Sequence, residues 1–566
     1  MGLVRTQRRL FDVKRTSIDQ TSRCTVVSNP VASQDEPAAA LATHAERVAQ
    51  LRRPGACGGH PDAAGLIETH LSSLLLAGGH VYKLKKPVAL PFVDFSTLAL
   101  RHAACAEELR LNRRTASHWY LNVVPVQQAE GGAVIAAPGQ ALAGTVVDWA
   151  VRMRRFDNQQ AFDRLAAAGR LSEAQVDGLA DAVAAFQAGQ PPLAAGPGHA
   201  EAEAETTCQA VRDNAAELAA MVAGTAMVAP VAVLQCWSRA AEQPALMAQR
   251  ARDGRVRDGH GDLHLGNVFW AEGAAVLFDA LEFDARLRQI DTVGDLAFTF
   301  MDLMAHGLPQ HAWRFINTTL EASGDWGALP LLAWWAVHRA AVRAKVALLS
   351  VAAGADDAAR AVGLARAQRY LDVAGALAAP DLPRTPQLVL MMGLSGSGKT
   401  AVAGQLAQQL GGVRLRSDVE RKRLFGLTAS ARVEPSLGLY TPEATRRTYA
   451  QLQALAEGAL RAGVAVVVDA ASLHRAERDA FRALARRLGM AFKLVLCEAP
   501  AAVLVQRLAA RQAAGQDASD ATVEVLKQQQ QFTEWPTDDE RVDLLRLATD
   551  VDRPQLAASV AALALG

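Results

Sequence analysis

Apolar and polar positions divide the chain into two halves that are built differently. In the first half, apolar runs on either side of Gly78-Gly79 predict a strand hairpin that ends at Pro87. A helical pattern follows over Leu100–Ala116, and an apolar strand is predicted over Val146–Met153. Amphipathic helical patterns then continue to about Ala379, so this half is predicted to pair a small sheet with a larger helical lobe.

Beyond Ala379 the pattern changes to regular alternation of strand and helix. Apolar strands are predicted over 387–392, 413–416, 464–468 and 492–497, with helical stretches between them. This alternation is typical of an α/β domain with a parallel sheet. The polar, proline-dense segment between the halves predicts a linker. The predicted organisation is therefore a flexible tail, a first domain, a linker and a second domain, at residues 1–45, 46–379, 380–386 and 387–566.

Composition restricts the classes of function. The 566 residues exceed what one core accommodates, and the formal net charge of +1 does not imply a nucleic-acid partner. The six cysteines show neither metal-binding spacing nor a disulfide framework, which indicates a reducing compartment. The apolar stretch 331–353 contains charged residues, so no membrane span is expected. We expect a cytoplasmic protein, and the sequence leaves its oligomeric state open.

The segment His260–Asn267 contains the residue types that phosphoryl transfer from ATP requires. Its acidic residue, Asp262, is placed to orient an acceptor hydroxyl and accept its proton. Asn267 and, after a short apolar hairpin, Asp279 are oxygen donors suited to the Mg²⁺ that bridges the phosphates. The spacing therefore predicts a catalytic base with two metal ligands.

This pattern, His-Gly-Asp-Leu-His-x-x-Asn followed by Phe-Asp, resembles the catalytic segment of the aminoglycoside phosphotransferase and choline kinase-like family. Glu282, Asp291 and Asp295 are similar to the acidic run that follows the metal-binding aspartate in that family. The resemblance covers about residues 60–350, and it implies a small-molecule kinase with an α+β protein-kinase-like fold.

In such a fold, a strand of the small sheet carries a lysine for the α- and β-phosphates. The following proline favours Lys85, with Lys83 as the second candidate, and alternation places both lysines on the same face. The resemblance also implies a glutamate on the next helix that pairs with this lysine, and Glu108 is its counterpart.

The second half opens with a phosphate-binding loop. A predicted strand leads into Gly-Leu-Ser-Gly-Ser-Gly-Lys-Thr, and a helix follows. The glycines let backbone N–H groups converge on phosphates at the helix N-terminus, while the lysine reaches the terminal phosphates and the threonine binds Mg²⁺. The residues predicted to bind ATP here are Gly393, Ser395, Gly396, Ser397, Gly398, Lys399 and Thr400.

Asp469, at the end of a predicted strand, suits the second carboxylate near this Mg²⁺. The arrangement of the domain resembles P-loop kinases related to polynucleotide kinase, gluconate kinase and chloramphenicol phosphotransferase. That resemblance implies that Asp418 orients the phosphoryl acceptor and that Arg421 binds it. Arg507 and Arg511 are similar to lid arginines that neutralise transition-state charge in those enzymes.

The order of the two domains resembles bacterial fusion proteins described as aminoglycoside phosphotransferase/ATP-binding proteins. The sequence thus predicts an ATP- and Mg²⁺-dependent phosphotransferase with two nucleotide sites and a small-molecule acceptor. The alternative is an ATP-binding regulatory protein in which one module is catalytically inactive.

Overall fold

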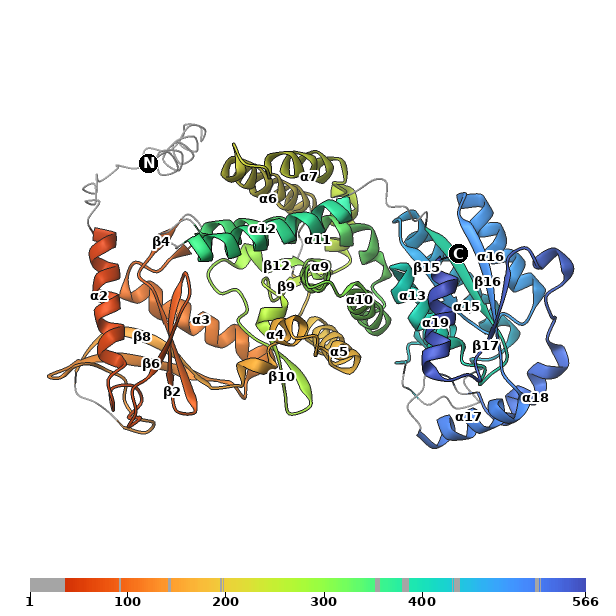
Figure 1. Ribbon diagram of the computed structural model, residues 1–566, viewed down its shortest axis with the longest axis horizontal. Coiled ribbons are helices and arrows are strands. Elements are labelled where there is room, and N and C mark those ends of the chain that lie inside the picture. The colour runs from red at the N-terminus through yellow and green to blue at the C-terminus, as the bar shows by residue number, and fades with distance from the viewer. Residues whose placement is uncertain are drawn as a thin grey trace.

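The computed structural model describes residues 36–90, 93–140, 144–193, 196, 198–351, 357–378, 386–429, 431, 438–514, 519 and 521–565. Figure 1 shows the two halves side by side along the long axis, the first in red to green and the second in teal to blue. The helix α2 (Glu36–Leu51) begins within the tail predicted for 1–45. Its apolar residues Val48 and Leu51 pack on the first sheet. The rest of that tail, and the linker apart from Pro386, lie outside the described residues.

An antiparallel sheet with the strand order β1-β2-β3-β8-β6-β7 begins the first half. The predicted hairpin is confirmed, since β2 and β3 flank the Gly78-Gly79 turn. One face of the sheet packs on α2 and the other on α3 (Leu98–Ala116). The strands are β1 (Gly65–Glu68), β2 (Ser72–Ala77), β3 (His80–Lys85), β6 (Tyr120–Ala129), β7 (Gly132–Val134) and β8 (Thr145–Arg154), with the separate pair β4 (Ala89–Leu90) and β5 (Val93–Asp94).

A helical lobe surrounds the buried helix α9 (Thr292–Ala305), nearly all of whose side chains are buried. A helix that is apolar on every side belongs in the middle of a lobe, and α10 and α11 pack against it. A capping box formed by Ser172 and Gln175 begins α5. The other helices are α4 (Phe162–Ala167), α5 (Glu173–Gly189), α6 (His199–Val222), α7 (Val228–Ala240), α8 (Pro244–Arg252), α10 (Pro309–Ser323), α11 (Leu329–Val351) and α12 (Asp357–Ala378).

Short strands at the junction of the sheet and the helical lobe frame the loop His260–Asn267. They are β9 (Val256–Asp258), β10 (Val268–Ala271), β11 (Ala274–Leu277) and β12 (Gln289–Asp291). The antiparallel pair of β10 and β11 is the apolar hairpin predicted from the sequence. No helix in the described ranges is long and apolar enough to cross a membrane.

The second half confirms the predicted parallel sheet, with the strand order β14-β15-β13-β16-β17. Its central strand β13 is almost entirely buried, as expected of a strand covered by helices on both faces. The strands are β13 (Gln387–Met392), β14 (Gly412–Arg416), β15 (Ala465–Asp469), β16 (Ala491–Glu498) and β17 (Leu544–Ala548). The helices are α13 (Lys399–Leu410), α14 (Ser417–Leu424), α15 (Pro442–Arg461), α16 (Arg475–Leu488), α17 (Ala501–Ala514), α18 (Val523–Phe532) and α19 (Arg553–Leu565).

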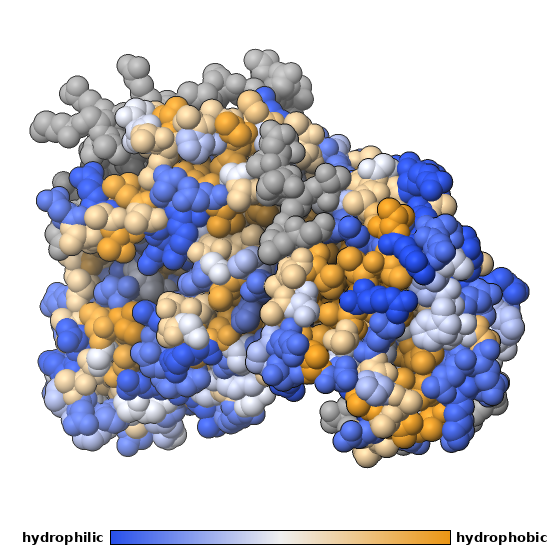
Figure 2. Space-filling model, turned by 45° about the vertical axis from the view of Figure 1, so that its right-hand side comes forward, coloured by the Kyte–Doolittle hydropathy of each residue, from blue (hydrophilic) through white to orange (hydrophobic). Residues whose placement is uncertain are grey.

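The two halves share a buried apolar interface. A single cluster of buried side chains runs from the helical lobe, including Phe315 and Leu320, into the second sheet, including Val413 and Leu415. Figure 1 shows α10 beside α13 at this junction, and Figure 2 shows a notch in the outline between the halves. Because one core spans the junction, residues of the first half lie within reach of the second sheet.

Candidate active sites

The loop His260–Asn267 is held by carboxylates of α9. The amides of His260 and Gly261 donate to the two oxygens of Asp295, at 2.7 and 2.9 Å. Further along the loop, the Leu265 amide donates to Asp302 at 2.9 Å. These hydrogen bonds hold both ends of the loop against a buried helix, and such support keeps the side chains of a loop in a fixed geometry.

Asp262 and Asn267, the predicted base and metal ligand, lie side by side on this loop. The side-chain amide of Asn267 donates to the carbonyl and the carboxylate of Asp262, at 2.9 and 3.1 Å. Burial favours the neutral form of Asp262, but His264, 3.6 Å away, and the positive charge of Arg343 outweigh it and hold the pKa of Asp262 well below its usual range. Asp262 is therefore an anion that can accept a hydrogen bond.

Asp279, the second predicted metal ligand, directly follows β11 and adopts a left-handed conformation with φ of 61°. Non-glycine residues in this region are uncommon and cluster at functional sites. Lys83 reaches Asp279 at 2.5 Å and Glu108 at 2.9 Å, so it links the sheet, α3 and the segment after β11. Glu108 and Asp279 come from distant parts of the chain, and both contact the ammonium group of Lys83.

Both candidate lysines contact Glu108, the glutamate expected on the following helix. Lys85 lies 2.5 Å from Glu108, contacts Glu282 as well, and is 1% exposed. Burial opposes the charge of Glu108, but the two lysines hold its pKa well below the usual range. Lys83, and not the sequence-favoured Lys85, contacts the part-exposed Asp279.

The loop between β13 and α13 has the backbone that a phosphate cradle requires. Gly393, Gly396 and Gly398 have φ of 144°, 84° and 83°. A Cβ atom on Gly396 would lie 2.8 Å from the carbonyl oxygen of Leu504, so neither the conformation nor the space admits a side chain. Lys399 folds over the loop and donates to the carbonyls of Gly393 and Leu394, both at 2.8 Å.

Carboxylates lie close to Lys399 at the ends of β14 and β15. Burial lowers the pKa of Lys399, and the charges of Asp469 and Asp418 oppose that effect. Burial raises the pKa of Asp418, and the nearby charge of Asp469 acts in the same direction. These mutual effects show that Lys399, Asp418 and Asp469 lie close enough for their charges to interact. Thr400 is exposed at the second position of α13.

The arginines predicted to act in this site occupy different positions. Arg421 is anchored by the Leu439 carbonyl at 2.8 Å and is 7% exposed. Arg511 donates to the Ala521 carbonyl at 2.9 Å, and its charge contributes to lowering the pKa of Lys399. Arg507 donates to the carbonyls of Gly396 and Thr549, so it braces the phosphate loop instead of lying free on a lid.

Two contacts of the phosphate loop were missed in the sequence. The amide of Ser395 donates to the side chain of Gln529, on α18, at 2.8 Å. The hydroxyl of Thr549, just after β17, donates to the Ser397 carbonyl at 2.8 Å. Gln529 stands in a run of four glutamines and Thr549 in an ordinary loop, so no local signal distinguishes either residue.

The donor set suits Mg²⁺ bound together with a nucleotide. Within the described part of the chain, no three or more His, Cys, Asp or Glu side chains form a group that could hold a metal ion. Mg²⁺ commonly uses one or two carboxylates plus substrate phosphates instead of an all-protein cage. Asp279 with Asn267, and Asp469 with Thr400, are oxygen donors that fit this use.

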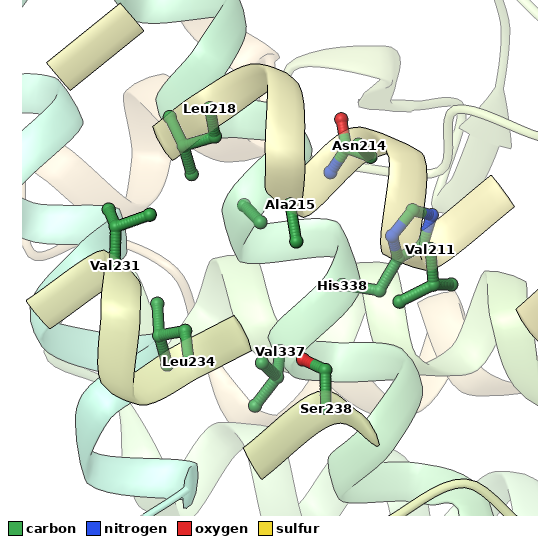
Figure 3. Close-up of a pocket in the computed structure, with 10 residues that line it drawn as sticks. Val211, Asn214, Ala215, Leu218, Val231, Leu234, Ser238, Val337 and His338 are labelled. Atoms are coloured by element: carbon green, nitrogen blue, oxygen red, sulfur yellow. The ribbon is translucent and has the colours of Figure 1, made fainter. Parts of the chain in front are cut away.

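Figure 3 shows a small cavity elsewhere, in the helical lobe between α6, α7 and α11. Its volume is about 10 Å³, close to the space that one water molecule needs. His338 points into it, and burial lowers the pKa of this imidazole to about 3. The cavity is too small for a metabolite.

Comparison with known proteins gives a family match and a full-length match. The family described as "AAA domain" matches residues 388–536. The uncharacterized protein Rv2004c of Mycobacterium tuberculosis is 30% identical over 484 residues, covering 83% of this chain and 91% of that protein. The uncharacterized protein Mb2027c of Mycobacterium bovis matches with the same values. The second half is therefore a P-loop domain, and the resemblance to relatives extends through both halves.

Solved structures also match about a third of the chain. A gluconokinase from Sinorhizobium meliloti 1021 is 20% identical, covers 32% of this chain and 93% of its own, and gives a TM-score of 0.24. The Mycobacterium tuberculosis APS kinase CysC is 23% identical, covers 32% of this chain and 100% of its own, and gives a TM-score of 0.25.

Proposed function

The chain belongs to the same family as Rv2004c of Mycobacterium tuberculosis, and we propose that it is an ATP-dependent phosphotransferase with two nucleotide sites. The observation that carries this proposal is that each half brings a lysine and at least two carboxylates together beside a loop. In the first half Lys83 contacts Glu108 and Asp279, and in the second half Lys399 lies near Asp418 and Asp469.

In the first half, the proposal gives the α+β domain a protein-kinase-like role. Lys83, held by Glu108, would bind the α- and β-phosphates, and Asp262 would orient the acceptor hydroxyl and take its proton. Bound Mg²⁺ would neutralise the charge that develops on the transferred phosphoryl group, and Asn267 and Asp279 supply oxygen ligands for it. Because its pKa is low, Asp262 is an anion when the acceptor binds and can accept a hydrogen bond from the acceptor hydroxyl.

In the second half, the phosphate loop and Lys399 would cradle the nucleotide. Asp418 has a raised pKa, to which the charge of Asp469 contributes, and this suits a group that exchanges a proton with an acceptor hydroxyl. Thr400 and Asp469 supply oxygen ligands for Mg²⁺. The P-loop lysine, the cradle glycines and two carboxylates at the ends of neighbouring strands together support a kinase reaction over simple nucleotide storage.

The acceptor is proposed to be a small molecule, and an aminoglycoside is not favoured. Such antibiotics carry several ammonium groups, which require clustered carboxylates. The groups that lower the pKa of Asp262 are instead His264, Arg343 and His260. We propose a cytoplasmic location, where ATP is available and thiols stay reduced, which agrees with the free cysteines.

The proposal is tested by ATP turnover and ATP binding in Asp262→Ala, Lys399→Ala and the double variant. Each single variant should lose the contribution of one site, and the double variant should lose both. Lys86→Ala is a control, because Lys86 follows β3 and pairs with Glu68. If one single variant leaves turnover unchanged while its site still binds ATP, that module is a regulatory one. If neither substitution changes turnover, the protein is not this enzyme.

A further inference from the structure

The helix α10, which belongs to the first half, covers the open edge of the second sheet. β14 is an outer strand of the described sheet, so one side of its backbone lacks a strand neighbour there. The side chain of Asn317 donates to the Gly412 carbonyl at 2.9 Å and accepts from the Arg414 amide at 2.6 Å. This amide imitates a neighbouring strand and fixes α10 in register with β14.

One turn later on α10, Glu321 reaches the side chains of the same strand. Its two carboxylate oxygens accept from Arg416 at 2.8 Å and from Arg414 at 3.0 Å. The Nε atom of Arg416 in turn lies 3.8 Å from the carboxylate of Asp469. A chain of alternating charges therefore runs from the first half, through Arg416, to the proposed metal ligand of the phosphate-loop site.

The same region of the first half also holds α14, which begins directly after Arg416 and carries Asp418. The indole of Trp326 donates to Glu420 at 3.0 Å, in a buried contact. Arg423 binds both Glu420 and the carbonyl of Glu321. Residues of the first half thus contact both β14 and α14, the two elements that lead to Asp418.

We propose that Glu321 is a positioning residue for the phosphate-loop site, so that the first half completes the site of the second. The long side chain of Arg416 is 15% exposed. Loss of its contact with Glu321 would let it sample more rotamers. Glu321 selects the rotamer that places the guanidinium beside Asp469, which keeps this carboxylate oriented for Mg²⁺. The inference rests on the proposed function, because it assigns Asp469 to that site.

The test uses the full chain and measures ATP affinity with and without Mg²⁺, by fluorescence of an N-methylanthraniloyl ATP analogue. The signal of interest is the part that Lys399→Ala removes. Glu321→Ala and Arg416→Met should each reduce the gain in affinity that Mg²⁺ confers by about fivefold, which corresponds to about one kcal/mol. Glu321→Gln keeps an oxygen acceptor for Arg416 and should retain most of the gain.

A double-mutant cycle separates positioning from a merely structural role. Glu321→Ala combined with Arg416→Met should be no weaker than Arg416→Met alone, because Glu321 acts through Arg416. Arg414→Met is the matched control: it removes the other contact of the same carboxylate and should change the Mg²⁺ gain less than twofold. Melting temperatures of all variants show whether they are folded, and if Arg416→Met does not fold, Arg416→Lys replaces it in the cycle.

The outcomes are distinguishable. If wild type and Lys399→Ala bind ATP equally, the proposed phosphate-loop function fails. If Lys399-dependent binding is present but Glu321→Ala keeps the full Mg²⁺ gain, the positioning role is overturned. Additive effects of Glu321→Ala and Arg416→Met, or an equal loss in Arg414→Met, overturn it as well. Non-additive losses with rescue by Glu321→Gln support it.

Discussion

Replacing each of the two lysines of the first site by methionine separates a structural role from a nucleotide-binding role. Lys85 is 1% exposed and its ammonium contacts Glu108 and Glu282. Lys85→Met leaves Glu282 buried without its cation, and breaking a buried pair in this way costs about 3 to 5 kcal/mol. Lys83→Met should cost about 1 to 2 kcal/mol, because its partner Asp279 is 37% exposed and water can solvate it.

The cost of Lys85→Met should depend on pH in a defined direction. Burial raises the pKa of Glu282, and the charge of Glu108 acts in the same direction, whereas Lys85 opposes both effects. When a carboxyl group has a higher pKa in the folded state than in the unfolded state, the free energy of unfolding falls as pH rises from the unfolded pKa through the folded pKa. Removing Lys85 raises the folded pKa of Glu282 further, so the variant should lose more stability at pH 8 than at pH 5.

Urea unfolding followed by tryptophan fluorescence at pH 5 and pH 8 measures these losses, and ATP binding is measured on the same variants. Lys83→Met should abolish ATP binding by the first site although it costs less stability. The reasoning is refuted if Lys83→Met destabilises as much as Lys85→Met. It is equally refuted if the loss in Lys85→Met is the same at both pH values.

Three further outcomes are expected. Arg478→Met should lower the free energy of unfolding by about 3 to 5 kcal/mol, measured in urea, because Arg478 forms a buried two-fold contact with Glu540; a loss below about 1 kcal/mol would contradict this. Gly396→Ala should abolish ATP binding by the phosphate loop, as measured by calorimetry, whereas Gly458→Ala on the helix α15 should leave binding intact and add up to about 1 kcal/mol of stability. The exposed Cys236 should react with maleimide at neutral pH in the native protein. Burial raises the pKa of four other thiols, those of Cys57, Cys105, Cys208 and Cys497, so they should react slowly. Rapid labelling of any of these four would contradict their burial.

Much of the fold was predictable because its signals are local. The Gly78-Gly79 turn, the strand–helix alternation after Pro386 and the capping box at Ser172 each depend on a few neighbouring residues. The tail was predicted to reach residue 45, whereas α2 begins at Glu36. Its helical pattern is short and gains stability by packing on the sheet, which no local signal records.

Within the candidate sites, the sequence identified residue types and the structure decided between them. Alternation along β3 correctly placed Lys83 and Lys85 on one face, as their shared contact with Glu108 shows. Which lysine contacts Asp279 and which contacts Glu282 depends on where these two carboxylates lie relative to the sheet. Those two carboxylates are almost 200 residues further along the chain, so spacing alone carries no such information.

By itself, the sequence determined the strand–helix alternation of the second half and the glycine cradle of the phosphate loop. These features need particular residues at fixed short spacings, because backbone conformation is set locally. Tertiary structure alone decided that Gln529 contacts the Ser395 amide and that Glu321 holds Arg416 beside Asp469. Such contacts arise when separately folded segments bury their apolar faces against one another, and the partner of a charged side chain is then chosen by the geometry of the shared core.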